Sequence, residues 1–179
     1  MWLVYLVFFL ALVSNCLVGY YISARRGEND TGKVRDVGFE MLPDLSRYEV
    51  VHDLTGVVIP SLFLAYKWFS AGGWSDAVKK RYLMTLTFMY AARAMTNIVT
   101  QLPSAKPGVC KVSPPFSFCN DYMFSGHTTF TIVTSYFVGK VLYPVYPIFA
   151  SLVTIATREH YSVDVLVAWI IFFAVQCRI

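Results

Sequence analysis

Charged residues are scarce in this chain. They make up 15% of its 179 residues, whereas soluble domains usually carry about 25%. Cysteine is also rare, with four in the chain, and hydrophobic residues reach 56%. These values exclude a disulfide-rich scaffold, a coiled coil and a disordered chain. No basic stripe is interleaved with aromatics, so we expect no nucleic-acid partner. The net charge of +4 favours contact with lipid headgroups instead.

Long apolar segments predict an all-α integral membrane protein. A helix needs about 20 apolar residues to cross roughly 30 Å of hydrocarbon. Six such segments leave short loops and no separate soluble domain, so we expect one transmembrane catalytic domain over 1–179. The expected spans are 2–22, 54–70, 82–102, 123–139, 141–157 and 161–177. For the first span a cleaved signal peptide is the alternative, but no positive region precedes the apolar run.

Counting crossings places three polar loops on one face of the membrane. These loops are 23–53, 103–122 and 158–161, and the short connections 71–81 and 140 lie on the other face. The surplus of Lys and Arg on the first face points to the cytosol. Two cysteines spaced for a disulfide, Cys110 and Cys119, would instead need an oxidising side. Composition therefore leaves the orientation open.

Two of the three histidines lie at this face, each where a loop meets a predicted span. His127 follows Ser125 and Gly126, and His160 precedes Asp164 by four residues. On a helix that spacing puts two side chains on one face, about 5–6 Å apart at Cβ. An aspartate there holds an imidazole in one tautomer and stabilises its cation. The pattern predicts attack of His160 on a phosphorus atom, with His127 as acid and base.

Two other interpretations of these residues remain. Interfacial histidines can simply face water or headgroups, although an ionisable residue inside a span such as Asp164 indicates a functional site. The second interpretation is a zinc site built from His127, His160 and Asp164, but the sequence has no tight metal-spacing motif there. We therefore assign no metal ligand and no cofactor.

Other polar residues are candidates for binding the substrate. Arg93, near the middle of the third span, could hold phosphate oxygens or pair with an intramembrane acid. Asp121 could also cap the fourth helix, Asp44 could be a turn acid, and His52 is expected to be an interfacial polar residue. With two further motif residues, the candidate substrate- or phosphate-binding set is Arg93, Asp44, Asp121, Ser125 and Tyr161.

Four ordered motifs resemble those of the sphingomyelin synthase family, which is related to the lipid phosphate phosphatases and phosphotransferases. The resemblance covers roughly 40–177, nearly the whole chain. The segments are 42–44 for the first motif, Tyr90, Arg93, Thr96 and 100–103 for the second, 119–128 for the third and 160–165 for the fourth. Asn120 stands where the family usually has a glycine after the motif cysteine.

The resemblance implies a fold, a reaction and a place in the cell. It implies a six-helix bundle in the Golgi or plasma membrane, with the active site on the lumenal or exoplasmic side. The reaction would move a phospho-headgroup, with phosphocholine expected first, from a glycerophospholipid donor to ceramide and release diacylglycerol. Phosphoethanolamine and phosphoinositol remain open, as does a homo-oligomer. The implied catalytic triad is His127, His160 and Asp164, without a metal.

Two rival functions remain. The same three residues could serve a lipid phosphatase or a phospholipase C-type hydrolase that uses water as the acceptor. A non-enzymatic lipid-binding, scramblase or transport protein is the rival of another class, and it would not depend on His127.

Overall fold

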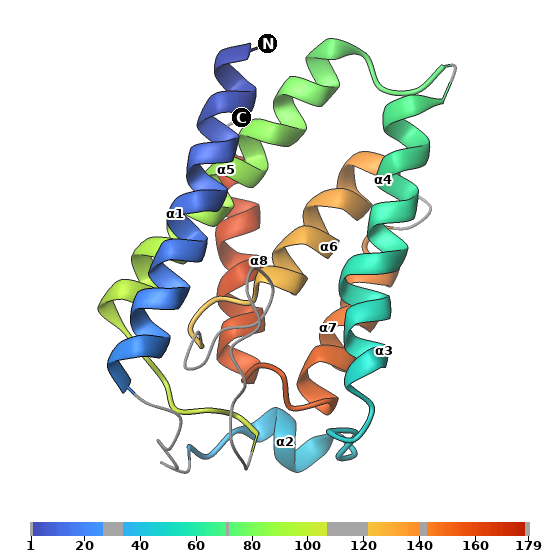
Figure 1. Ribbon diagram of the computed structural model, residues 1–179. Helices are drawn as coiled ribbons and strands as arrows, with labels where there is room; N and C mark the ends of the chain where they lie inside the picture. The colour runs from blue at the N-terminus through green and yellow to red at the C-terminus, as the bar shows by residue number, and fades with distance from the viewer. Residues whose placement is uncertain (1, 27–33, 71, 107–121, 140–142, 178–179) are drawn as a thin grey trace.

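The computed structural model describes residues 2–26, 34–70, 72–106, 122–139 and 143–177, and all regular secondary structure within these ranges is helical (Figure 1). The elements are α1 (Trp2–Arg26), α2 (Val37–Met41), α3 (Glu49–Asp53), the π-helix η1 (Leu54–Val58), α4 (Ile59–Phe69), α5 (Asp76–Val99), α6 (Gly126–Val138), α7 (Val145–Ala156) and α8 (Ser162–Gln176).

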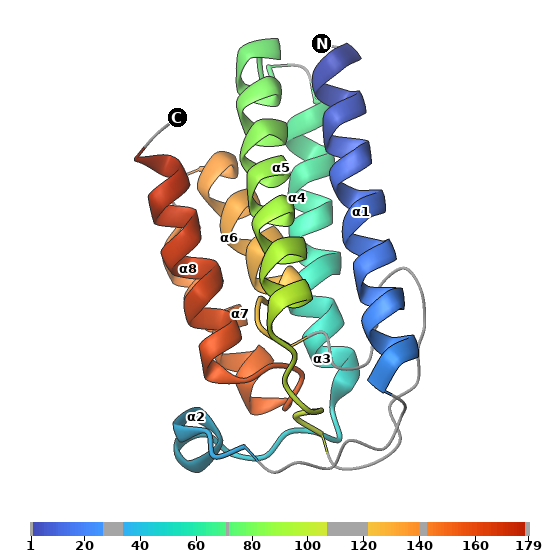
Figure 2. The ribbon, with the colours of Figure 1, turned by 90° about the vertical axis from the view of Figure 1, so that its left-hand side faces the viewer.

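The helices form an upright bundle in which successive members run in opposite directions. α3, η1 and α4 follow one another without a break and make a single rod, so the bundle has six rods, with α2 lying across one end (Figures 1 and 2). The described parts of the three predicted polar loops, 34–48, 100–106 and 157–161, lie at that same end. We call it the motif end.

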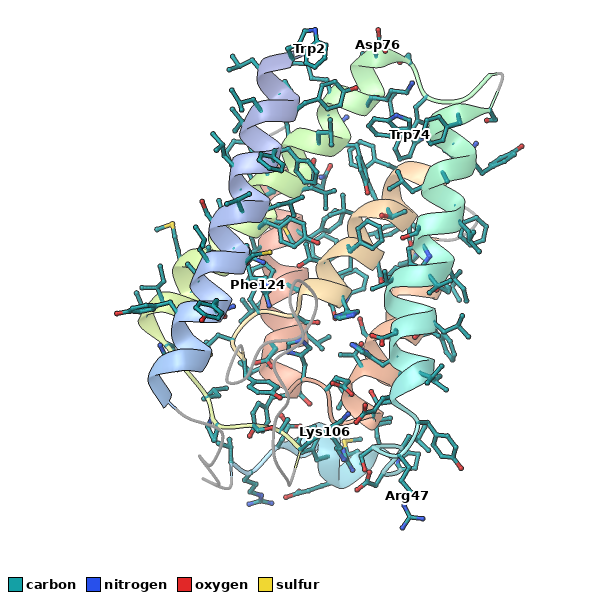
Figure 3. The ribbon with its side chains drawn as sticks, viewed as in Figure 1. Trp2, Arg47, Trp74, Asp76, Lys106 and Phe124 are labelled. Atoms are coloured by element: carbon teal, nitrogen blue, oxygen red, sulfur yellow. The ribbon has the colours of Figure 1, made fainter. Side chains whose placement is uncertain are left out.

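α6 is the central helix of the bundle. It packs against α4, α5, α7 and α8, whereas α1 packs mainly along α5. The buried apolar core lies between α5, α6 and α8 and consists of Tyr82, Leu83, Leu86, Met89, Phe124, Ile132, Val133, Ala168 and Phe172. Figure 3 shows Phe124 near the middle of the bundle, with Trp74 and Asp76 toward one end and Lys106 and Arg47 toward the motif end.

The outer surface is apolar while part of the interior is polar. Trp2 on α1 is 90% exposed and Phe69 on α4 is 83% exposed, whereas Thr129 and Thr131 of α6 are buried. This distribution suits a lipid environment, where polar side chains are best satisfied between helices. Two helical stretches, Trp2–Tyr21 and Glu49–Phe69, are long and apolar enough to cross a membrane.

The six predicted membrane crossings stay a prediction, because the remaining helices of the described chain do not meet the length and apolarity of a membrane span. α7 and α8 are apolar but have 12 and 15 residues, fewer than the about 20 that a crossing needs. α5 begins at Asp76, six residues before the predicted span at 82–102, because the Ser75 hydroxyl accepts from the Val78 N–H at 3.4 Å and caps the helix. The basic segment 79–81 therefore lies in the helix rather than in a turn.

The π-helix has a cause in the sequence. Pro60 has no N–H, so it cannot donate to a carbonyl one turn earlier, and the ladder shifts so that the Ile59 N–H bonds to Leu54 O. Two carbonyls of η1 instead accept from side chains of neighbouring helices. Thr55 O accepts from the Tyr146 hydroxyl at 2.6 Å, and Gly56 O accepts from the Thr131 hydroxyl at 3.0 Å. These bonds fix η1 against α6 and α7.

Candidate active site

His160 and Asp164 meet at the start of α8. His160 Nδ1 lies 3.0 Å from Asp164 Oδ2, and the Asp164 side chain is completely buried. From the spacing we predicted that the two side chains lie on one face of a helix. That prediction was wrong, because α8 begins at Ser162 and His160 lies before it. Asp164 occupies the third position of α8 and turns back to accept from both the Tyr161 N–H, at 3.0 Å, and the His160 ring. With Nδ1 held by the carboxylate, Nε2 of His160 is the free nitrogen.

A backbone bond joins the two histidine segments. The Ser125 N–H donates to Asp164 O at 3.2 Å. The Ser125 hydroxyl accepts from the Thr128 N–H at 3.2 Å and caps α6, so His127 lies in the first turn of that helix. First-turn N–H groups favour a nearby anion such as a phosphate. The Ser125–Asp164 bond therefore links the start of α6, which carries His127, to the start of α8, which carries the His160–Asp164 pair.

His127 has a carboxylate of its own, on another helix. Its Nε2 lies 3.3 Å from Asp53 Oδ1, which is an ion-pair distance. This nitrogen is buried, and it makes no hydrogen bond among the described residues. The ring rests on the backbone of η1, where a Cβ at Gly56 would lie 3.0 Å from His127 Cδ2. A larger residue at this position would require the ring to shift.

His52 is buried beside His127, whereas we expected an interfacial position. It is 3% exposed, and its ring centroid lies 4.1 Å from that of His127. His52 Nδ1 lies 3.3 Å from the Thr154 hydroxyl, which donates its own hydrogen to Ala150 O. The Thr154 oxygen can therefore only accept from His52, which puts the hydrogen of the neutral ring on Nδ1 and leaves a lone pair on Nε2.

Arg93 holds the segment that leads into α6. Its Nε donates to Phe124 O at 2.9 Å, and its Nη1 donates to Asn15 Oδ1 of α1 at 2.6 Å. A Cβ at Gly126 would lie 3.3 Å from Nε, so the guanidinium lies against the first residue of α6. These contacts give Arg93 a positioning role, and its predicted binding of phosphate stays a prediction.

Asp36 caps two helices at once. Its Oδ1 accepts from the Phe39 N–H at 3.1 Å at the start of α2, and its Oδ2 accepts from the Ser162 N–H at 2.8 Å at the start of α8. The Ser162 hydroxyl adds a bond to Oδ1 at 2.7 Å. A Cβ at Gly38 would lie only 2.1 Å from that hydroxyl, so glycine permits the close approach of α2 to α8. Asp36 thus fixes the segment that carries His160 and Asp164.

Aromatic and ionic contacts tie the remaining segments of the motif end. The Tyr161 hydroxyl donates to Pro103 O at 3.1 Å. The ring of Tyr122 contacts the His160 ring edge-on at 5.6 Å, and burial raises the pKa of its phenol. Lys106 pairs with Glu49 at 2.8 Å and also contacts Glu159. These bonds join the 100–106 segment to α3 and to the turn before α8.

The other residues predicted to bind substrate have different positions. Asp44 is in an exposed turn, where it accepts from the Ser46 N–H at 2.9 Å, and this bond holds the pKa of its carboxyl below the usual value. The Ser125 hydroxyl caps α6 by accepting from the Thr128 N–H. The Tyr161 hydroxyl donates to Pro103 O. Asp121, Cys110 and Cys119 lie outside the described residues.

Sequence reasoning did not select His52, Asp53 or Asp36 as site residues. Each lies in the polar stretch before the second predicted span, where several acids look equivalent. One signal in the sequence was the spacing of Asp53, Gly56 and Pro60. A proline one turn after a glycine removes a helical hydrogen bond close to the acid. Nothing in the sequence shows that this helix packs on α6.

Comparison with known proteins agrees with this architecture. Residues 118–177, which contain both site histidines, match the family model described as PAP2 superfamily C-terminal. In this segment the chain is similar to members of the PAP2 superfamily.

Curated relatives narrow the class. The chain is 30% identical over 173 residues to phosphatidylinositol:ceramide inositolphosphotransferase 2 of Arabidopsis thaliana, an alignment that covers 76% of this chain and 56% of that protein. It is 26% identical over 174 residues to sphingomyelin synthase-related 1 of Caenorhabditis elegans, covering 73% and 35%. The chain belongs to the sphingolipid synthase family within the PAP2 superfamily. It spans about half the length of the plant relatives. The family and the two apolar helices indicate a membrane protein.

Proposed function

We propose that this protein transfers a phospho-headgroup from a glycerophospholipid to ceramide and releases diacylglycerol. The observation that carries the proposal is the presence of two histidine–carboxylate pairs, His160–Asp164 and His127–Asp53, whose histidine segments are joined by a backbone bond, in a bundle with an apolar outer surface. A lipid phosphodiester at the membrane boundary would lie between these pairs. We place this end on the lumenal or exoplasmic side of the Golgi or plasma membrane.

The first half of the reaction breaks the bond between phosphorus and the glycerol oxygen. Nε2 of His160 attacks the phosphorus atom, and the bond to the diacylglycerol oxygen breaks as the new N–P bond forms. His127, protonated beside Asp53, gives its proton to that oxygen, so diacylglycerol leaves as an alcohol. The headgroup phosphate remains on His160 as a phosphohistidine.

The second half reverses these roles with another alcohol. His127, now neutral, takes the proton of the primary hydroxyl of ceramide, and the ceramide oxygen attacks the phosphorus atom. The N–P bond to His160 breaks and the free imidazole returns. Because both halves pass through one site, the kinetics should be ping-pong.

The two carboxylates serve different histidines. Asp164, fully buried, holds His160 by Nδ1 and stabilises the positive charge that develops on the ring during attack. Asp53, whose side chain is 68% exposed, stabilises protonated His127 and leaves it free to exchange its proton. The burial of Asp164 and the exposure of Asp53 suit the partner of a nucleophile and the partner of an acid–base group respectively.

The donor headgroup has two leading candidates. The motifs resemble those of sphingomyelin synthases, which favours phosphocholine. Several of the relatives, from Arabidopsis thaliana and Oryza sativa, are phosphatidylinositol:ceramide inositolphosphotransferases, which favours phosphoinositol. A comparison of donors in the transfer assay distinguishes the two.

The test uses purified protein in detergent with labelled ceramide and separate phosphatidylcholine, phosphatidylinositol and phosphatidylethanolamine donors, with products read by mass spectrometry. We expect one labelled sphingophospholipid and an equal amount of diacylglycerol. His160→Ala should abolish transfer, and Asp164→Asn should lower the rate by at least about 10³-fold. Glu40→Gln, which changes an exposed acid at the motif end, is the matched control.

Two results would contradict the proposal. Headgroup phosphate released into water, with no labelled product from any donor, would make the protein a hydrolase. Full transfer by folded His160→Ala would remove the phosphohistidine step. Folding of each variant is checked by size-exclusion chromatography and thermal unfolding.

A further inference from the structure

His52, Asp53 and His127 form a cluster with the chemistry of a metal site. One ring nitrogen of each histidine and one carboxylate oxygen of Asp53 all lie within 4.8 Å of one another. Imidazole nitrogen with carboxylate oxygen is a donor set that suits zinc and neighbouring transition metals rather than Mg²⁺ or Ca²⁺. Only Asp53 and His127 belong to the proposed transfer chemistry, so the position of His52 needs another explanation.

The distances fit a small metal ion. With metal–ligand bonds of about 2.0–2.1 Å, the ligand atoms of a tetrahedral zinc site lie about 3.3 Å apart. His127 Nε2 and Asp53 Oδ1 are 3.3 Å apart. The His52 nitrogen lies within 4.8 Å of both atoms, so closing the cluster needs the His52 ring to approach them by at most about 1.5 Å. Three protein ligands leave a fourth position open.

Each ring has a nitrogen that a metal could bind. His127 Nε2 is buried without a hydrogen bond among the described residues. His52 has its hydrogen on Nδ1 because the Thr154 oxygen can only accept, so its Nε2 carries the lone pair that a metal binds. A hydrogen bond from the second ring nitrogen is the usual support of a metal-bound histidine. The exposed Asp53 carboxylate provides a path for the ion from the motif end.

We propose that His52, Asp53 and His127 bind a divalent transition-metal ion of the zinc type, and that the bound ion inhibits group transfer. A metal on Nε2 of His127 replaces the proton that this nitrogen carries and occupies the Asp53 carboxylate that stabilises the protonated ring. The inhibition rests on the proposed function, whereas the binding does not. Since His160 and Asp164 lie outside the cluster, the nucleophile pair stays intact when the ion binds.

The first test measures binding alone. Co²⁺, which replaces Zn²⁺ and has visible absorption bands, is titrated into the purified protein in detergent, and Zn²⁺ is then added. We expect bands of a protein-bound ion that disappear when Zn²⁺ displaces Co²⁺. His52→Ala should weaken Co²⁺ binding at least about tenfold, and Thr154→Val, which removes the supporting hydroxyl, should weaken it about 10–100-fold. His160→Ala, a histidine removed at the same end of the bundle, should bind as the unchanged protein does.

The second test measures transfer with and without Zn²⁺, each variant being compared with its own metal-free rate. We expect inhibition over the same concentration range as binding, and resistance to it in His52→Ala. Absence of Co²⁺ bands in the unchanged protein, or equal affinity in His52→Ala, overturns the site. Binding without inhibition overturns the regulatory part. If no donor gives transfer, the Co²⁺ titrations still decide the site, so the two proposals fail separately.

Discussion

Gly56→Ala is the change that tests the placement of His127 most directly. The new Cβ would lie 3.0 Å from His127 Cδ2 and 3.1 Å from its Cβ, whereas carbon atoms in contact lie about 3.5–4.0 Å apart. The ring must therefore move by about half an ångström. A misplacement of 1 Å at a reacting group can cost about 10²-fold in rate, so we expect transfer to fall about tenfold.

Stability should change very little. Alanine is favoured over glycine in a helix by about 1 kcal/mol, which offsets part of the cost of the contact. Gly56→Ala should therefore remain folded while its kcat falls, as measured by initial rates of ceramide phospholipid formation beside thermal unfolding in the same detergent.

Val58→Ala is the matched control because it lies in the same π-helix and is 45% exposed. We expect it to keep full activity. The reasoning is refuted if Gly56→Ala transfers headgroup at the unchanged rate, or if Val58→Ala loses as much activity as Gly56→Ala does.

Two further predictions concern the groups that hold the site. Asp36→Ala removes the caps of α2 and α8 and should lower the free energy of unfolding by about 1–2 kcal/mol, measured by denaturant titration; an unchanged midpoint would contradict the double cap. Arg93→Lys cannot reach both Phe124 O and Asn15 Oδ1, and losing a hydrogen bond to a charged group should cost about 1.5–3 kcal/mol. Transfer should fall with it, and a lysine variant as stable and active as the unchanged protein would show that the fork geometry is not needed.

The local features of the site could be predicted from the sequence because they depend on neighbours along the chain. His160 and Asp164 are four residues apart, and an acid in the first turn of a helix can reach back to the residues before it, so their contact follows from local geometry. The Ser125 cap of α6 is of the same kind. The alternation of apolar segments with polar loops likewise predicted that each histidine lies where a loop meets a helix, and His127 and His160 do lie at the starts of α6 and α8.

The partners of His127 could not be predicted, because they come from a different helix. Asp53 and His52 reach it only because η1 packs on α6, which in turn depends on Gly56 having no side chain and on the carbonyl that Thr131 holds. The partners of Arg93 could not be predicted either. Its charge inside a predicted span indicated that it needs partners, but the sequence did not identify Phe124 O as one of them.

The class of protein, the apolar helices and the His160–Asp164 contact follow from residues that are close together along the chain. The acid that faces His127, the burial of His52 beside it and the bond from Asp36 to the start of α8 follow from the packing of separate helices. Helix periodicity and capping act over a few residues, whereas packing partners depend on side-chain shape across the whole bundle.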